Sequence, residues 1–268
     1  MKHPSLLLLL VFTLVPFTHK TAVASSSKIQ ETLQYNVMSH NNKVATVSIK
    51  VDKNKGRVTK IQGEVKTEGT LWKVYPVHNR QITHVKRNGT PSKTFQKRSE
   101  FDWTENFNIR YKKQKVHVFY EKSGKENNRV RSYSGTVQDV LTALHALSTW
   151  DLEKTPVLVF TMFSGKQFYR VTAKPGSLEE IWTPYNSVSS ARKIDITIEK
   201  LSHRGKVKEV KMSMWVKPGQ PDYPIKATYS ALYVGSVDII LSHRASTKVL
   251  RKARSGTQKA LKVRGPKK

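Results

Sequence analysis

Residues 206–244 read KVKEVKMSMWVKPGQPDYPIKATYSALYVGSVDIILSHR and carry the clearest strand signal in the chain. From Val210 to Val216 every second residue is apolar, which is the period of a strand with one buried face. The segment Pro218–Asp222 interrupts the pattern, because its two prolines lack the N–H that a strand ladder needs. A second alternating run extends from Ile225 to Leu241, with Gly235 at an expected bulge. The simplest interpretation is an antiparallel pair of strands.

Short alternating runs separated by turn residues fill most of the chain before this pair. Asn, Asp and Gly lie between them at His40–Asn42, Asp52–Gly56 and Asn88–Gly89, which is the composition of hairpin turns. Closely spaced strands of this kind predict a mainly β protein, with an antiparallel curved sheet that forms a sandwich or a partly open barrel. The expected strands are 33–37, 44–51, 58–65, 71–77, 81–86, 92–97, 101–111, 116–120, 156–162, 167–173, 179–184 and 194–201.

One segment, Thr136–Trp150, has a helical period instead. Its apolar residues recur three and four positions apart, so one face of a helix would be apolar. Ser134 or Thr136 is expected to cap the helix, with Asp139 in the first turn. Since the apolar face must be buried, this one α-helix is expected to cover the sheet.

The first residues have the order of a secretory signal peptide. A basic start at Lys2 precedes the apolar run Leu6–Phe17, and Ala22-Val23-Ala24 offers the small residues of a cleavage site. The apolar run is shorter than the roughly 18 residues of a membrane span. We therefore expect a signal peptide at 1–24, a single β-rich domain at 25–245 and a periplasmic location, with secretion as the alternative.

Charge is the most unusual feature of the composition. The 268 residues have a formal net charge of +29 and include no cysteine. Removing residues 1–24 would take away two lysines and no acid, so the mature chain would carry +27. Such a charge favours anionic partners. The lack of cysteine excludes disulfides, zinc–thiolate sites and iron–sulfur clusters.

The basic residues become densest at the carboxyl end. Residues 246–268 contain no acid and few apolar residues, a composition typical of a disordered tail. We expect this tail to contact an anionic surface through its positive charges. These charges belong to Lys248, Arg251, Lys252, Arg254, Lys259, Lys262, Arg264, Lys267 and Lys268.

Catalytic and metal-binding motifs do not occur. The chain has no H-E-x-x-H, G-x-S-x-G, P-loop or G-x-G-x-x-G sequence, and its nine histidines do not show metal-ligand spacing. We expect no catalytic residues, no metal site and no cofactor.

The aromatic residues point to a candidate binding site. Trp215 alternates with the apolar residues of its strand, so it lies on the opposite face, between Lys211 and Lys217. A tryptophan among lysines either covers a second layer or faces an amphipathic, anionic ligand. We take Trp215, Lys211, Lys217 and Trp182 as the candidate ligand-binding residues.

Several short segments occur in an order that resembles a known family. They are Leu33-x-Tyr35, Glu180-Ile181-x-Thr183-Pro184, Trp215-Val216, Pro224-Ile225-Lys226 and Gly235–Leu241. This order resembles DUF3108, an exported bacterial family of unknown function, over nearly all of the mature chain. The resemblance implies a periplasmic, mostly antiparallel β protein of Gram-negative type, and it implies no established catalytic residues.

Together these features predict a non-enzymatic protein of the cell envelope that binds an anionic component. The expected partner is lipopolysaccharide, phospholipid, an acidic polymer or an acidic protein, with peripheral membrane contact. One alternative is a nucleic-acid-binding protein, which the charge favours and the export signal disfavours. Another is a hydrolase of envelope polymers, which would need a clustered pair of acids.

The signal peptide makes a direct prediction about the mature protein. Protein isolated from the periplasm should begin at Ser25, because cleavage is expected after Ala24. Amino-terminal sequencing checks this, and an intact Met1 terminus in the membrane fraction would contradict it.

Overall fold

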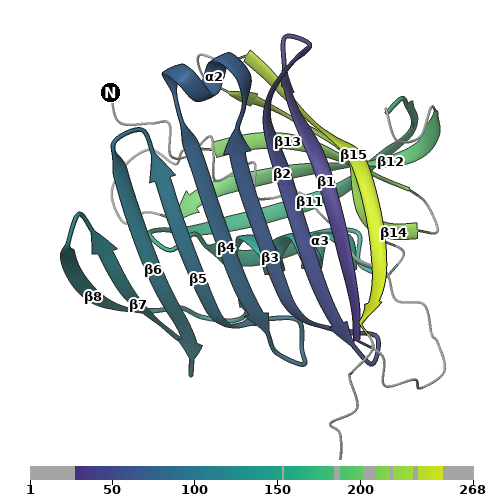
Figure 1. The fold of residues 1–268 in the computed structure, drawn as a ribbon. Helices are drawn as coiled ribbons and strands as arrows, with labels where there is room; N and C mark the ends of the chain where they lie inside the picture. Colours follow the sequence, from purple (N-terminus) through teal and green to yellow (C-terminus); the bar gives the residue numbers. More distant parts are fainter. Residues whose placement is uncertain are drawn as a thin grey trace, which may run out of the picture.

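The computed structural model describes residues 28–152, 154–183, 188–201, 209–217, 220–231 and 235–249. In these residues 15 strands form one sheet, and two helices accompany it (Figure 1). The expectation of a mainly β fold with a curved antiparallel sheet is confirmed. The expected signal peptide lies outside the described residues.

The strands follow one another along the sheet, with the two ends of the domain meeting at its centre. Their order in the sheet is β8-β7-β6-β5-β4-β3-β2-β1-β15-β14-β13-β12-β11-β10-β9. The elements are β1 (Lys28–Ser39), β2 (Asn42–Asn54), β3 (Arg57–Thr67), α2 (Gly69–Val74), β4 (Val77–Val85), β5 (Pro91–Glu100), β6 (Trp103–Lys112), β7 (Lys115–Lys122), β8 (Lys125–Ser132), β9 (Val137–Gln138), α3 (Val140–Ser148), β10 (Leu158–Phe163), β11 (Phe168–Ile181), β12 (Ser189–Leu201), β13 (Glu209–Lys217), β14 (Gln220–Ala231) and β15 (Gly235–Val249).

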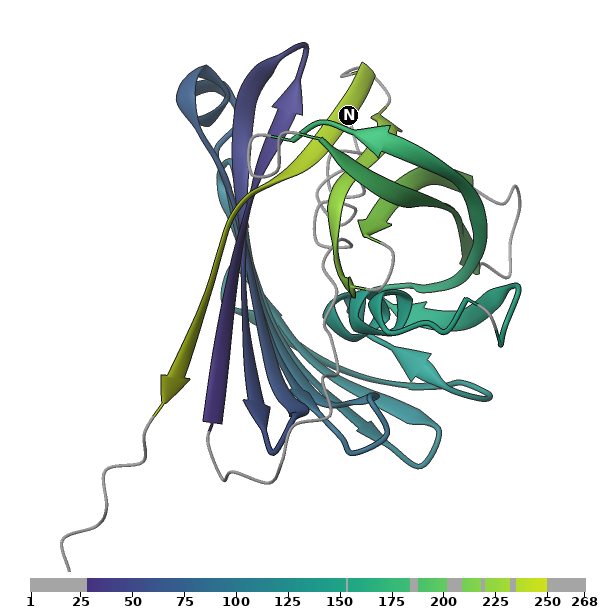
Figure 2. The same ribbon diagram turned by 90° about the vertical axis from the view of Figure 1, so that its right-hand side faces the viewer.

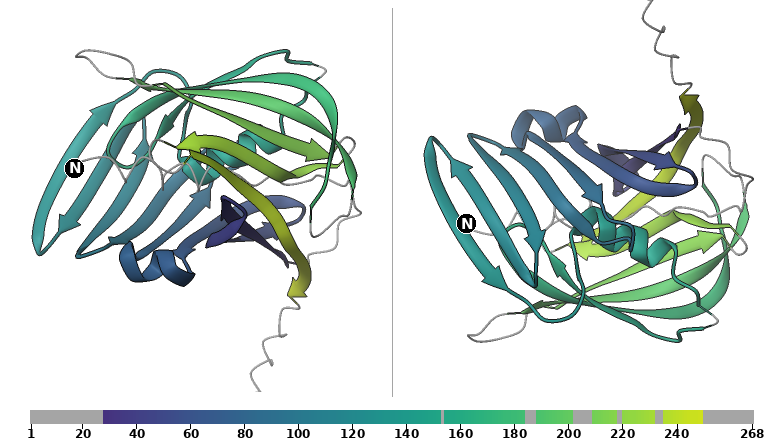
Figure 3. Two further views of the ribbon diagram at one scale, coloured as in Figure 1. Left: turned by 90° about the horizontal axis from the view of Figure 1, so that it is seen from above. Right: turned by 90° about the horizontal axis from the view of Figure 1, so that it is seen from below.

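The sheet is antiparallel except where β9 pairs with β10. It curls so that its two halves face each other, and α3 lies between them (Figures 2 and 3). The edge strands β8 and β9 do not pair with each other, so hydrogen bonds do not close the sheet into a barrel. We call the place where β5–β7 approach β9, β10 and the β10–β11 turn the seam.

Tight turns set the register of the first half. Both central residues have positive φ at His40–Asn41, Lys55–Gly56, Lys113–Gln114 and Ser123–Gly124. This geometry belongs to type I′ turns, whose twist matches that of the strands they join. The turns expected at His40–Asn42 and Asp52–Gly56 are present but shorter, at His40–Asn41 and Lys55–Gly56, because β2 begins at Asn42 and ends at Asn54.

The core lies between the two halves of the sheet and is centred on α3. Leu33, Ile49 and Ile61 from the first half are fully buried in it, as is Leu141 of the helix. Leu144 is also buried there, so the apolar face of the helix covers the sheet as expected. A second apolar cluster joins residues of β6 and β7 to residues of β9 and β10 and closes the seam by packing.

Asp139 attaches α3 to the sheet. Its Oδ1 accepts hydrogen bonds from the backbone N–H and the hydroxyl of Thr142, both at 2.8 Å, which caps the helix. Its Oδ2 accepts from Gln81 Nε2 at 3.0 Å, from Thr94 at 2.5 Å and from the hydroxyl of Thr83. Because these three donors come from β4 and β5, one buried carboxylate fixes both the start of the helix and its place on the sheet.

The helix is shorter than expected, and its cap is a different residue. It spans Val140–Ser148, and Asp139, which we expected in the first turn, caps it in place of Ser134 or Thr136. The cap lies later because Val137 and Gln138 pair with β10 and so cannot be helical. A second helix, α2, occupies part of the strand expected at 71–77.

The segment 206–244 forms three strands instead of two. The run from Ile225 to Leu241 reverses, because Ala231 pairs with Gly235 and Tyr229 with Val237. Here odd-numbered residues of β14 pair with odd-numbered residues of β15, as Ala227 does with Ile239. The apolar residues therefore keep the same spacing of two on both strands, and the sequence pattern does not reveal the reversal. Gly235 is thus the first residue of β15 instead of a bulge.

Other boundaries also differ from the expectation. The strands expected at 167–173 and 179–184 belong to one long strand, β11, with a register shift between Pro175 and Leu178. The strand β8 was not expected, because its residues are almost all polar and exposed. At the end of the domain, β15 continues to Val249, past the expected tail boundary at 246, because Thr247 and Lys248 pair with β1. Residues 250–268 lie outside the described part of the chain.

Neither described helix is long and apolar enough to cross a membrane.

The position of Asp139 predicts a large effect on stability. Asp139→Ala removes the helix cap and leaves buried donors without an acceptor, so it should lower the free energy of unfolding by more than about 3 kcal/mol. Asp139→Asn should cost less, because asparagine also caps helices. Chemical denaturation followed by circular dichroism measures both variants.

Asp151→Ala serves as the control, because it removes an exposed acid just after the helix whose carboxylate pairs with Lys154 Nζ and accepts from the Lys154 backbone N–H. It should change the stability by less than about 0.5 kcal/mol. Equal stability of Asp139→Ala and Asp151→Ala would show that Asp139 does not hold the helix.

Candidate functional site

Trp215 lies on the outer face of β13, away from the main core. Its side chain is only 9% exposed and packs against Ala191 and Ile225, with Ile181 beside them. The indole N–H donates a hydrogen bond of 2.8 Å to Glu179 Oε2. This bond and a second one from Ser177 lower the pKa of Glu179.

The lysines that flank the Trp215 ring are not the expected ones. Lys193 and Lys226 lie with Nζ 6.0 and 5.6 Å from the ring centroid. Each also forms an ion pair with an acid, at 3.4 Å to Asp195 and 3.0 Å to Asp238 respectively. The positive charge around Trp215 is therefore largely balanced by neighbouring acids.

The other expected ligand residues lie on the same strand as Trp215 or just after β11. Lys211 and Lys217 are on the same face of β13, and Lys211 pairs with Glu209 at 3.4 Å. Trp182 follows β11 and is 65% exposed. The structure thus brings Trp215 next to lysines, and ligand binding by Trp215, Lys211, Lys217 and Trp182 stays a prediction. Of the expected tail residues only Lys248 lies in the described part of the chain.

The inner face of β4 and β5 carries a row of buried polar side chains that sequence analysis missed. Gln81, already bonded to Asp139, accepts from Gln96 Nε2 at 2.8 Å. Arg98 Nη2 donates to Gln96 Oε1 at 3.1 Å and to the backbone oxygen of Ser164 at 2.5 Å. A continuous series of hydrogen bonds therefore leads from the helix cap to the β10–β11 turn across the seam.

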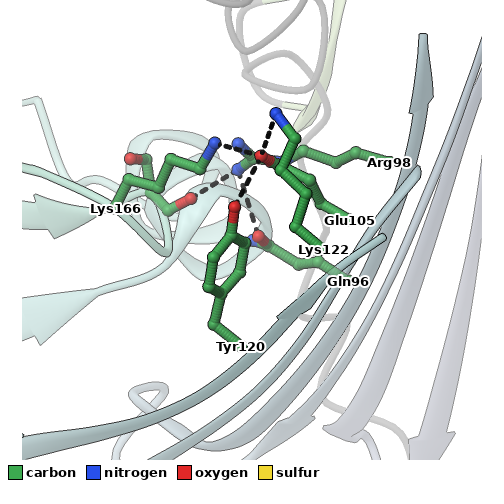
Figure 4. Close-up of polar contacts among 7 residues, drawn as sticks. Gln96, Arg98, Glu105, Tyr120, Lys122 and Lys166 are labelled. Atoms are coloured by element: carbon green, nitrogen blue, oxygen red, sulfur yellow. Dashed lines mark hydrogen bonds and ion pairs between the residues drawn. The ribbon is translucent and has the colours of Figure 1, made fainter. Parts of the chain in front are cut away.

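A charged cluster forms the end of this series (Figure 4). Glu105 Oε1 accepts from Lys166 Nζ at 2.6 Å and from Tyr120 Oη at 2.9 Å, and Lys122 Nζ lies 3.6 Å away. Lys166 belongs to the β10–β11 turn, whereas the carboxylate belongs to β6. The ion pair therefore connects the two halves of the sheet at the seam.

Gly165 allows the turn to come this close. It has φ +94°, and a Cβ at this position would lie 2.8 Å from Gln96 Oε1. Such a contact is too short, so a side chain here would displace the Gln96 amide, and the positive φ would also strain it. The glycine and the Glu105–Lys166 pair together place the turn against the inner face of the sheet.

Two carboxylates near Arg98 differ in their acidity. Burial raises the pKa of Glu100, and Arg98 offsets this only in part. Burial would also raise the pKa of Glu105, but the hydrogen bonds from Lys166 and Tyr120 outweigh it, so the pKa lies below its usual value. Both carboxyl groups are almost completely buried, at 2% and 1% exposure.

The described residues include no group of three or more His, Cys, Asp or Glu side chains that could hold a metal ion.

The outer face of the first half carries a line of basic side chains that runs across the strands. We call Lys60, His84, Lys93, Arg110 and His117 the basic row. Each member lies directly opposite the next on the neighbouring strand, from β3 to β7. On the same face, four residues from His84 along β4, Arg80 lies opposite Lys97 of β5.

Apolar side chains form a second line beside the basic row. We call Ile82, Phe95, Asn108 and Phe119 the apolar row, because all of its members except Asn108 are apolar. Phe95 is 36% exposed and Phe119 is 43% exposed. Lys93 Nζ lies 4.2 Å from the Phe95 ring centroid, and the Arg110 guanidinium lies 5.7 Å from that of Phe119. These cation–π contacts hold the basic side chains against the face.

Several of these cations form no ion pair with any described acid, namely Arg80, Lys93, Lys97 and Arg110. Of the remaining contacts with acids, Glu64 lies opposite Arg80 on β3, and Lys60 is paired with Asp52 at 3.7 Å. Like charges placed directly opposite each other destabilise a sheet. The sequence shows the basic residues, but only the register of five strands, β3 to β7, brings the basic row into one line.

Comparison with known proteins gives a family and a fold. The family described as a protein of unknown function, DUF3108, matches residues 32–242. No curated protein matches the chain.

Two solved structures are similar to the chain to different extents. A β-barrel-like protein of the DUF1849 family of unknown function, from Brucella abortus, has a TM-score of 0.56 at 9% identity, over 82% of this chain and 98% of that chain. A candidate lipoprotein from Parabacteroides distasonis has a TM-score of 0.35 at 8% identity, over 82% of this chain and 96% of that chain. The first likeness supports the barrel-like fold, and the match over residues 32–242 shows that the chain belongs to DUF3108.

Proposed function

We propose that the protein is a non-enzymatic, exported protein of the cell envelope that binds an anionic envelope component. The observation that carries this proposal is the outer face of β4–β6, where Lys93 lies opposite Arg110 and Arg80 lies opposite Lys97. An anionic partner would relieve the repulsion within these pairs. The same repulsion that destabilises the free protein would therefore favour binding of the partner.

The contrast with the other charged clusters supports this choice of surface. At the seam, Glu105 is bonded to Lys166. Around Trp215, Lys193 and Lys226 each have an acid within ion-pair distance. A partner that bound at either cluster would have to break existing ion pairs, whereas the cations on β4–β6 are available without that cost.

The buried pair of acids favours a second candidate, a hydrolase of envelope polymers. The pKa of Glu100 is raised and that of Glu105 is lowered, and such a divergence is typical of an acid and a base in one site. However, both carboxyl groups are buried, and Glu105 is occupied by Lys166. These contacts favour a structural role at the seam. Release of reducing ends from an envelope polysaccharide, lost in Glu100→Gln, would support the hydrolase.

Binding to anionic partners should depend steeply on salt. The mature protein should bind lipopolysaccharide, an acidic polysaccharide or phosphatidylglycerol vesicles at low salt and lose affinity as salt rises, because screening acts within about 8 Å at physiological ionic strength. Sedimentation or calorimetry with each probe measures this. A neutral polysaccharide and phosphatidylcholine vesicles are the controls, and equal binding to charged and neutral probes would contradict the proposal.

Removal of the basic tail tests how much of the binding depends on the tail and how much on the face of β4–β6. Truncation after Val249 keeps all of β15 and lowers the net charge of the mature chain from +27 to +19. Affinity for an anionic probe should fall at low salt but not vanish, because each basic residue near the surface contributes up to ~1 kcal/mol and the face of β4–β6 remains. The melting temperature should stay within a few degrees, and complete loss of binding would assign it to the tail alone.

A further inference from the structure

We infer that the basic row and the apolar row together form a binding site for an extended acidic polysaccharide that runs across strands β4–β7. This assignment rests on the anionic partner proposed above and specifies both its chemical class and its place on the fold. The occupant is a chain of sugar units that carry carboxylates, such as a polyuronate.

The spacing of the basic row fits a regularly charged chain. Its members lie on successive strands, and neighbouring strands are about 4.8 Å apart, so the row spans on the order of 20 Å from Lys60 to His117. A sugar unit in an extended chain advances by about one strand spacing and presents one carboxylate. Because successive units of an extended chain are rotated relative to each other, alternate carboxylates face the sheet. Each of these can bind two neighbouring basic side chains, such as Lys93 and Arg110.

The apolar row supplies the second half of the recognition. Phe95 and Phe119 are partly exposed beside the basic row, each with a cation near its ring, and they lie two strands apart with Asn108 between them. The negative face of an aromatic ring attracts the C–H groups on the flat side of a sugar. Aromatic residues two strands apart can thus contact alternate sugar units of the same chain.

The shape of the face argues against a membrane as the occupant. The sheet curls around α3, so β4–β7 present their outer, convex side here (Figure 3). A flat bilayer would touch such a face over a small area, while a single extended chain can follow it. The rings of Phe95 and Phe119 also arise from the middle of strands and not from the tips of loops.

A single-stranded nucleic acid is the closest competitor, because it too combines regular charge with flat rings. Its bases would need aromatic platforms on which to stack. The two exposed phenylalanines are separated by the Asn108 strand, so successive bases would find no aromatic ring on the strand between them. A polyuronate whose alternate units face the sheet suits rings two strands apart better.

The test compares two double variants of the full mature chain that remove the same charge. Lys93→Gln with Arg110→Gln changes the basic row, and Lys55→Gln with Arg57→Gln changes exposed residues at the β2–β3 turn, outside both rows. Binding to oligogalacturonate is measured by calorimetry, with oligogalactose as the neutral control. Phosphatidylglycerol vesicles and a single-stranded oligothymidylate are measured in parallel.

The inference predicts that the basic-row variant loses affinity for oligogalacturonate by about tenfold or more and the turn variant by less than about threefold. Without ligand, the basic-row variant should melt at the same or a higher temperature, because the repulsion between Lys93 and Arg110 is gone. Phe119→Ala should also weaken binding while leaving the protein folded.

Other results would overturn the assignment in distinguishable ways. Equal losses in the two double variants would show that binding depends on charge anywhere on the surface, and the proposed function would stand without this site. Tighter binding to vesicles or oligothymidylate, lost in the basic-row variant, would keep the site and reject the polysaccharide. No binding to any anionic probe would reject the proposed function as well.

Discussion

The buried carboxylate of Asp139 is the interaction on which the rest of the structure depends. An open sheet of 15 strands has to bury its inner face, and α3 is the element that lies between the two halves. Asp139 caps that helix through Thr142 and receives donors from β4 and β5 with its second oxygen. The helix is thereby fixed against the first half of the sheet, and the row of polar side chains that begins at Gln81 continues to the seam, where Arg98 reaches the β10–β11 turn.

This arrangement separates two kinds of charge. Ionisable groups inside the fold have partners, as Glu105 has Lys166, because an isolated charge in the interior would be very unfavourable. On the outer face of β4–β6, Lys93 lies opposite Arg110 and Arg80 lies opposite Lys97, and the contacts of Lys93 and Arg110 with aromatic rings do not neutralise their charge. The fold thus holds the basic row on a rigid sheet whose register the core determines. A surface built in this way can present charges at a fixed spacing, which a flexible tail cannot do.

The sequence predicts the strands well and their assembly less well. Alternation and turn chemistry locate most strands of the first half, and the spacing of apolar residues locates α3. Alternation cannot show the reversal between β14 and β15, because Tyr229 and Val237 face the same side across it. It also cannot show which face of β5 is buried, since Thr94, Gln96 and Arg98 are polar and yet point inward. The seam cluster and the basic row depend on register between strands, so single-sequence patterns did not reveal either. Trp215 was placed on the correct face, but its neighbours Lys193 and Lys226 come from other strands.

The central claim is that uncompensated cations on the outer face of β4–β7 are the place where an anionic chain binds. Chemical-shift mapping of the isotope-labelled mature protein during titration with oligogalacturonate tests it most directly. The account predicts that the largest changes cluster at the backbone amides of Lys93, Phe95, Arg110 and Phe119, with little change at Asp139 or in the core. Changes concentrated around Trp215 and Lys193, or spread evenly over all lysine-rich surfaces, would contradict it.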